Sequence, residues 1–309
     1  MSSRLKMTAR NAFWSYFSMF VSFGLQFISR TVFIYCLGEE YLGINGLFSN
    51  VLGVLSFAEL GIGTAINFCL YKPVAENNIE KIKSYMWYYK WAYRTIAVII
   101  TIIGLALIPF LNVLVKDPGN VGNIVIYYLI YLFNTVTTYF VSYKYSLVNA
   151  EQKNYIYTNV NLIISTSTII IQVIALVIWK NFLIYLLVAA IFGVFQKIFI
   201  CIYFNRLYPY LKEKNIEKLT KQEKSILITK IKALVIHKIG DVSVHQTDNI
   251  IVSAFVSTKM VGLLSNYNLF ISTVSSCINV LFNSVTGSLG NLVATESKEY
   301  QYIIFKRER

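Results

Sequence analysis

Long apolar segments recur along this 309-residue chain and leave little sequence between them. About eight of them are long enough to cross the roughly 30 Å hydrocarbon core of a bilayer as helices. They lie near residues 11–37, 42–70, 86–115, 121–149, 155–179, 182–205, 227–256 and 262–292. A chain that is 56% hydrophobic and only 14% charged is too apolar for an ordinary soluble domain. The sequence therefore predicts an all-α polytopic membrane protein.

The basic residues predict how these helices cross the membrane. Lys and Arg gather in alternate connections, around residues 4–10, 72–94, 144–153, 206–224 and 298–309. The opposite connections hold only Lys116, Lys180 and Lys259. By the positive-inside rule, this alternation places both termini in the cytoplasm. The net charge of +13 is spread over short segments and not gathered in one patch, so we expect contact with membrane lipids and no nucleic-acid partner.

The first segment contains a single charged side chain in its apolar part, that of Arg30. It lies beside a row of polar residues that steps by three or four, which places the row on one helix face. This row consists of Asn11, Ser15, Ser18, Ser22, Gln26 and Ser29. A charge at membrane depth costs about 2.5 to 3.5 kcal/mol on insertion scales, so it should face protein or water. We therefore expect Arg30 and Gln26 to line a polar cavity.

Two further segments carry polar rows with the same spacing. The second segment contains Asn45, Ser49, Gly53, Ser56, Glu59, Gly63 and Asn67, and the eighth contains Asn268, Ser272, Ser276, Asn279, Asn283 and Thr286. Helix packing can explain one such row, because small and polar residues commonly mediate contacts between membrane helices. Several rows, together with charges on the first, second and seventh segments, favour a solvated lumen.

The seventh segment is the most polar. It carries Lys230, Lys232, His237, Lys238, Asp241, His245 and Asp248. Three interpretations remain open: pairing that allows the helix to insert, a site for a ligand or coupling ion, and a metal site. The metal site is the least favoured, because His237, Asp241 and His245 have no convincing further ligand. Asp241, His245 and Asp248 are the candidates for binding a coupling ion, H⁺ or Na⁺.

No nucleotide-binding, zinc-protease or dinucleotide motif occurs in the chain, so we expect neither a cofactor nor catalysis. The connections between the segments are short. This argues against a membrane glycosyltransferase or polymerase, whose chemistry usually needs large loops with catalytic side chains.

Several stretches together resemble a known family. They are Ser29-Arg30-Thr31, residues 35–47 (YCLGEEYLGINGL), residues 58–65 (AELGIGTA), Gly240-Asp241 with residues 247–251, and Val261-Gly262 with residues 265–267. The pattern resembles the Wzx-like oligosaccharide flippases, polysaccharide biosynthesis proteins of the multidrug/oligosaccharidyl-lipid/polysaccharide (MOP) exporter superfamily. The resemblance runs from about residue 10 to the end, and it is most specific in the first two segments.

This resemblance implies a flippase in the plasma membrane of a bacterium. Its substrate is an undecaprenyl-pyrophosphate-linked oligosaccharide repeat unit, which moves from the cytoplasmic to the outer leaflet. The implied fold has two lobes around a cavity lined by helices 1, 2, 7 and 8. Residues 1–208 then form the N-terminal lobe, 209–226 a basic cytoplasmic linker and 227–309 a partial C-terminal lobe. Relatives have more spans, so we expect this chain to be C-terminally truncated.

The resemblance also implies which residues bind the substrate. Cationic residues of the cavity would hold the pyrophosphate, with Arg30 first and Lys238 and His237 behind it. Arginine suits this role because its fork of donors meets phosphate oxygens in pairs. The remaining cavity candidates are Gln26, Asn45, Glu59 and Asn279. The alternative is an ion-coupled exporter of small cationic compounds from the same superfamily, although such a site needs dominant carboxylates.

Overall fold

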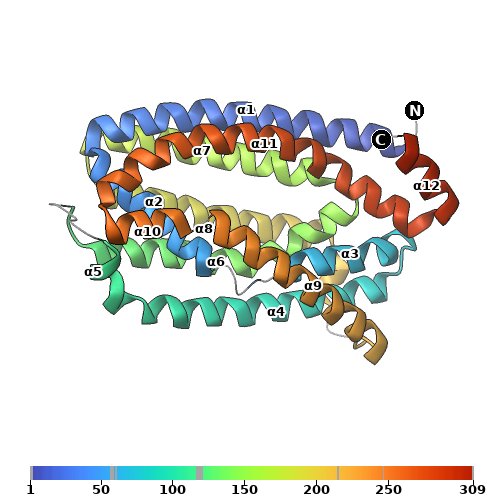
Figure 1. The fold of residues 1–309 in the computed structure, drawn as a ribbon. Coiled ribbons are helices and arrows are strands. Elements are labelled where there is room, and N and C mark those ends of the chain that lie inside the picture. Colours follow the sequence, from blue (N-terminus) through green and yellow to red (C-terminus); the bar gives the residue numbers. More distant parts are fainter. Residues whose placement is uncertain are drawn as a thin grey trace.

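The computed structural model describes residues 3–55, 59, 61–115, 121–213, 216–245 and 247–307. This part of the chain contains helices and no strand, which confirms the all-α prediction. The α-helices are α1 (Ser3–Leu37), α2 (Glu39–Leu55), α3 (Ile62–Ala75), α4 (Ile79–Ala106), α5 (Leu111–Leu114), α6 (Ile124–Ala150), α7 (Asn154–Trp179), α8 (Phe182–Leu207), α9 (Lys221–His245), α10 (Thr247–Phe255), α11 (Thr258–Thr295) and α12 (Lys298–Arg307). Two 3₁₀ turns, η2 (Ile108–Phe110) and η3 (Pro209–Lys212), lie between them. Most of the long helices run along one common direction and form an elongated bundle (Figure 1).

Five of the described helices are long and apolar enough, by length and composition, to cross a membrane. They are Ala9–Leu37 of α1 and the whole of α4, α6, α7 and α8. Four match predicted segments to within a few residues. The fifth, α4, is shifted toward the N-terminus relative to the predicted 86–115, because Pro109 follows it and has no backbone N–H to continue the helix. The protein is thus a multi-pass membrane protein.

The other three predicted segments differ from continuous apolar spans. Residues 42–70 are divided between α2 and α3, and Gly61, just before α3, has a φ of 74°. This left-handed conformation interrupts a right-handed helix, and glycine adopts it without steric cost. Residues 227–256 lie in α9 and α10, on either side of residue 246, which is outside the described residues. Residues 262–292 lie within α11, which is helical but is not among the five apolar spans.

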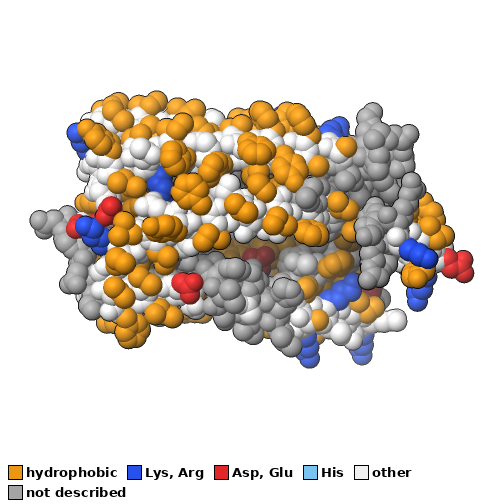
Figure 2. All heavy atoms as spheres, turned by 45° about the horizontal axis from the view of Figure 1, so that its top comes forward, with side chains coloured by type: hydrophobic (Ala, Val, Ile, Leu, Met, Phe, Trp, Pro, Cys, Tyr) orange, Lys and Arg blue, Asp and Glu red, His pale blue; other side chains and the backbone are white. Residues whose placement is uncertain are grey.

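The helices pack through large aromatic and aliphatic side chains. α1 lies against α7, and α6 lies between α4 and α8. Phe182 of α8 is buried and meets Phe33 of α1 edge-on, with the ring centroids 5.8 Å apart. Hydrophobic side chains cover much of the outer face in Figure 2, whereas many of the visible Lys and Arg side chains lie toward the end where α9 and α12 are found. An apolar belt with charged ends is the surface that a bilayer requires.

The segment after α8 is tied to α4 by charged contacts. Lys83 of α4 contacts Glu213 at 2.8 Å, and Lys81 contacts Glu223 of α9 at 3.0 Å. The backbone N–H of Thr220 donates to the Glu223 carboxylate and holds the pKa of that carboxyl below its usual range. α9 begins at Lys221, inside the segment predicted to be a linker. The division into lobes at 208 and 227 stays a prediction.

α11 lies alongside α1 and α2 over much of its length (Figure 1). Glycines permit its closest approaches. A Cβ at Gly262 of α11 would lie 2.6 Å from the carbonyl oxygen of Glu39, and one at Gly43 of α2 would overlap the carbonyl oxygen of Thr258. Near the other end of α11, a Cβ at Gly290 would overlap the ring of Tyr71 in α3. Small residues therefore hold α11 against the N-terminal helices near both of its ends.

Candidate functional site

Arg30 on α1 reaches across to α11. Its Nε donates a hydrogen bond to the side-chain oxygen of Asn266, and its Nη2 donates to the hydroxyl of Ser265. The side chain is half-buried. Both acceptors are neutral, so these hydrogen bonds orient the guanidinium without neutralising its charge. The first and eighth predicted segments thus meet at the charged residue that the sequence singled out.

A smaller cavity of about 190 Å³ lies on one side of Arg30. Its lining residues are Gln26, Ser29, Arg30, Phe33, Leu42, Asn45, Ile169, Tyr185 and Leu269. Three of the predicted site residues, Gln26, Arg30 and Asn45, therefore come together here. The Asn45 side-chain oxygen accepts a hydrogen bond from the hydroxyl of Tyr131 on α6, which fixes the orientation of the amide.

A larger cavity of about 560 Å³ also contains Arg30 in its wall. It is lined by Arg30, Gly46, Asn50, Asp248, Ser265, Asn268, Leu269, Ile271, Ser272, Ser275, Ser276 and Asn279. Two more predicted site residues, Asp248 and Asn279, are thus brought to the same space. Most of the polar lining comes from the hydroxyls and amides of α11. The cavity offers one cation, one carboxylate and many neutral donors and acceptors.

Glu59 does not line either of these cavities. Its carboxylate accepts a hydrogen bond from the Tyr93 hydroxyl of α4, and the Tyr89 hydroxyl donates to that of Tyr93 at 3.0 Å. The ring of Tyr139 on α6 lies 5.5 Å from that of Tyr93, centroid to centroid. Glu59 thus lies among the tyrosines of α4 and α6, and its role in binding the substrate stays a prediction.

We predict that Tyr93→Phe destabilises the protein. The substitution removes a hydroxyl that donates to a carboxylate in a largely buried cluster, and leaving such a group unsatisfied costs about 1 to 3 kcal/mol. Denaturant unfolding in detergent, followed by tryptophan fluorescence, measures the change. Tyr88→Phe on the same helix is the matched control, because its hydroxyl has no hydrogen bond to a residue in the described ranges. Equal stability of the two variants contradicts the assigned role of Tyr93.

Four predicted residues cannot be placed in either cavity. The side chains of His237, Lys238, Asp241 and His245 lie outside the described residues, although all four belong to α9. The metal site considered for the seventh segment would use three of these side chains, those of His237, Asp241 and His245, so it also lies outside the described residues. Within the described part of the chain, no group of three His, Cys, Asp or Glu residues is arranged to hold a metal ion. Coupling-ion binding stays a prediction.

Sequence reasoning missed the residues that orient the predicted ones. Ser265 and Asn266 bind Arg30, and Tyr131 binds Asn45. A signal for Ser265 was present, because it lies three residues before Asn268 and extends the polar row of the eighth segment by one turn. Tyr131 gave no such signal, since tyrosine is common throughout this chain.

This arrangement suits a ligand that carries both phosphate and hydroxyl groups. A guanidinium binds phosphate oxygens through paired N–H donors. Amides and hydroxyls both donate and accept, which matches the hydroxyls of a sugar. A bundle of apolar helices with a polar cavity between them is the architecture of a membrane transporter.

The comparison with protein families agrees with the class of membrane transporters. Residues 8–286 match the family described as polysaccharide biosynthesis protein, and the chain belongs to that family. The family and the helical membrane fold point to a polysaccharide-related membrane exporter and not to an enzyme. No curated protein and no solved structure matches the chain.

Proposed function

We propose that the protein is a flippase for an undecaprenyl-pyrophosphate-linked oligosaccharide. It would work in the plasma membrane of a bacterium, with both termini in the cytoplasm, and supply repeat units for a cell-surface polysaccharide. The observation that carries this proposal is the position of Arg30, which lies in the walls of both polar cavities and is held by neutral groups of α11. Family membership supports the link to polysaccharide.

In this proposal Arg30 binds the pyrophosphate. Phosphate oxygens replace Ser265 and Asn266 as acceptors, so the positive charge gains an anionic partner in place of two neutral ones. The hydroxyls and amides of α11, Ser272 and Asn279 among them, would then bind the sugars in the larger cavity. The apolar polyprenyl tail stays in the bilayer, where its transfer to water is avoided.

An ion-coupled exporter of small cations remains the alternative. Asp248 in the larger cavity favours it, because a carboxylate attracts a cation. Arg30 lines the same cavity and repels a cation, which is why we prefer an anionic substrate. Resistance of cells to cationic dyes distinguishes the two functions: the flippase leaves dye resistance unchanged on expression, and the exporter raises it.

Deletion of the gene in its native host tests the proposed function. We expect loss of the surface polysaccharide and accumulation of the lipid-linked repeat unit, because synthesis continues on the cytoplasmic leaflet while export stops. Mass spectrometry of extracted lipids measures the accumulated intermediate. Expression of the wild-type chain should reverse both effects. Deletion that leaves the surface polysaccharide and the lipid-linked pool unchanged contradicts the proposal.

A further inference from the structure

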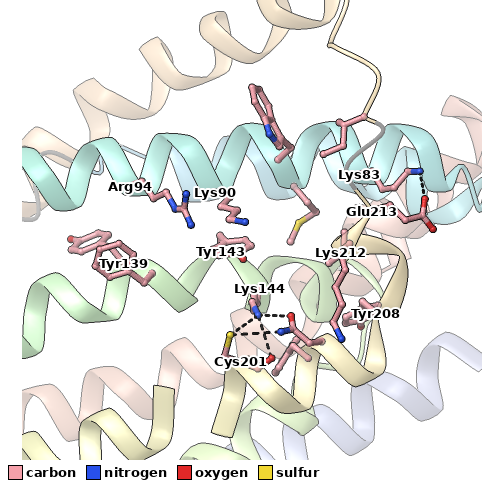
Figure 3. Close-up of a pocket in the computed structure, with 17 residues that line it drawn as sticks. Lys83, Lys90, Arg94, Tyr139, Tyr143, Lys144, Cys201, Tyr208, Lys212 and Glu213 are labelled. Atoms are coloured by element: carbon pink, nitrogen blue, oxygen red, sulfur yellow. Dashed lines mark hydrogen bonds and ion pairs between the residues drawn. The ribbon is translucent and has the colours of Figure 1, made fainter. Parts of the chain in front are cut away.

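A third cavity has a volume of about 600 Å³. It lies between α4, α6, α8 and the 3₁₀ turn η3 that follows α8. Five of its lining residues are basic and one is acidic, and we call it the basic pocket: Lys83, Lys90, Arg94, Lys144 and Lys212 with Glu213. Figure 3 shows Lys90 and Arg94 extending from α4 toward Tyr143 of α6. The basic pocket shares no lining residue with either cavity of Arg30.

Glu213, the one carboxylate among the described residues that line the basic pocket, is already paired with a lysine. Glu213 contacts the Nζ of Lys83 at 2.8 Å, and Glu80 contacts the same Nζ at 2.6 Å. Lys83 is therefore paired with two carboxylates. In the described part of the chain, no carboxylate lies within ion-pair distance of Lys90, Arg94, Lys144 or Lys212. The pocket consequently has an excess of positive charge that the carboxylates of the described residues do not balance.

Lys144 shows that this charge lies inside the protein and not only at its rim. The residue is 5% exposed. Its Nζ donates to Asn205 Oδ1 at 2.8 Å and to the carbonyl oxygen of Cys201 at 3.3 Å. These acceptors are neutral, so they satisfy the N–H groups but leave the charge without a counter-ion. A buried charge of this kind is costly unless it is paired, which favours binding of an anion in the pocket.

Aromatic residues mark the depth of the pocket in the membrane. Trp87 lines the pocket and is 39% exposed, and Trp91, one turn further along α4, is 51% exposed. The guanidinium of Arg94 lies 5.6 Å from the centroid of the Trp91 ring. Tryptophan is enriched where the headgroups of lipids meet the hydrocarbon core. The phosphate groups of lipids lie at this same depth in the membrane. Basic pockets between membrane helices on the cytoplasmic side bind anionic headgroups.

We propose that the basic pocket binds a phosphate group, carried either by the headgroup of an anionic lipid or by free phosphate. Lys90 and Arg94 of α4 contact the anion directly. Lys144 of α6 stabilises it by its charge, and Lys212, in the segment that leads to α9, contacts it from the opposite wall of the pocket. This binding is separate from the transported substrate and does not depend on flippase activity. Bound phosphate joins α4, α6 and α8 at one end of the bundle.

Quenching of tryptophan fluorescence by brominated lipids tests this proposal in the purified full chain. The protein is reconstituted in phosphatidylcholine bilayers that contain a small fraction of brominated phosphatidylglycerol or, at the same fraction, brominated phosphatidylcholine. We expect stronger quenching by the anionic lipid, because Trp87 borders the pocket. Lys90→Gln combined with Arg94→Gln should weaken the apparent affinity for the anionic lipid about thirtyfold.

Lys72→Gln combined with Lys298→Gln is the matched control, since both lysines are exposed and neither lines the pocket. It removes the same charge and should retain the selective quenching. If the pocket variant does not fold, Arg94→Gln alone serves, because this side chain is exposed. Added inorganic phosphate identifies the source of the anion: relief of quenching shows that free phosphate binds, and unchanged quenching shows that the lipid headgroup does. Equal quenching by both brominated lipids, together with a tryptophan fluorescence that added phosphate leaves unchanged, overturns the proposal, and so does an equal loss in the pocket and control variants.

Discussion

Arg30→Ala should abolish transport of the lipid-linked oligosaccharide while the protein still inserts into the membrane. Among the described residues, the Arg30 side chain is the only cation in the walls of the two cavities that it lines, so its loss removes the group that we propose binds the pyrophosphate. Removing one partner of a desolvated charge pair costs about 2 to 5 kcal/mol, which lowers the transport rate at least about thirtyfold. The measurement is the amount of repeat unit that reaches the outer leaflet in cells that lack the wild-type gene.

Two further variants separate the charge of Arg30 from its geometry. Arg30→Lys should restore transport only in part, because an ammonium keeps the charge but lacks the planar fork of donors. Thr31→Val is the neighbouring control: Thr31 is exposed, and within the described ranges its hydroxyl donates a hydrogen bond only to the carbonyl oxygen of Phe27 in its own helix. It should transport like the wild type. Wild-type transport by Arg30→Ala at equal expression would remove Arg30 from the site.

A disulfide between α2 and α11 should stop transport reversibly. Ser265 Cβ lies 3.8 Å from the position that a Cβ at Gly46 would occupy. This separation matches the mean of about 3.8 Å in disulfides, so Gly46→Cys with Ser265→Cys should cross-link on oxidation. Alternating access is largely a rocking of one half of a transporter against the other, and the cross-link holds α11 to the N-terminal helices. We expect transport to fall to background and to return on reduction.

The background for this experiment is a chain whose four cysteines, Cys36, Cys69, Cys201 and Cys277, are replaced by alanine. Each single cysteine variant, treated with the same oxidant, serves as the control for changes at Gly46 or Ser265 alone. Reduction tests the same molecule without the cross-link, so loss of the Ser265 contact with Arg30 does not confuse the result. Full transport by a chain that is completely cross-linked contradicts movement of α11 relative to α2.

The sequence predicted the five apolar spans and the shared helix face of Arg30 and Gln26, because both depend on local spacing. Arg30 and Gln26 are one turn apart in a continuous helix, so their shared face follows from the helical period. The polar row of the second segment was predicted from the same period, and it includes Glu59. That row assumed one helix over 42–70, but α2 ends at Leu55, before Glu59, so the helical period does not carry from Asn45 to Glu59.

The basic pocket could not be predicted from the sequence because its residues also carry the topology signal. Lys90, Arg94 and Lys144 belong to the basic clusters that orient the helices, and these clusters together hold most of the Lys and Arg residues of the chain. Only the packing of α4 against α6 and of α6 against α8 brings these side chains around one cavity. Contacts between distant segments of this kind depend on the fold and leave no periodic pattern.

Transport by the purified protein in proteoliposomes tests the central claim most directly. The substrate is the lipid-linked oligosaccharide extracted from the deletion strain, and a membrane-impermeant sugar-modifying enzyme reports the fraction that faces outward. We predict that this fraction rises with time in vesicles that contain the wild-type chain, and that it stays at the level of empty vesicles with Arg30→Ala. A fraction that does not rise with the folded wild-type chain, or that rises equally with both chains, contradicts this account.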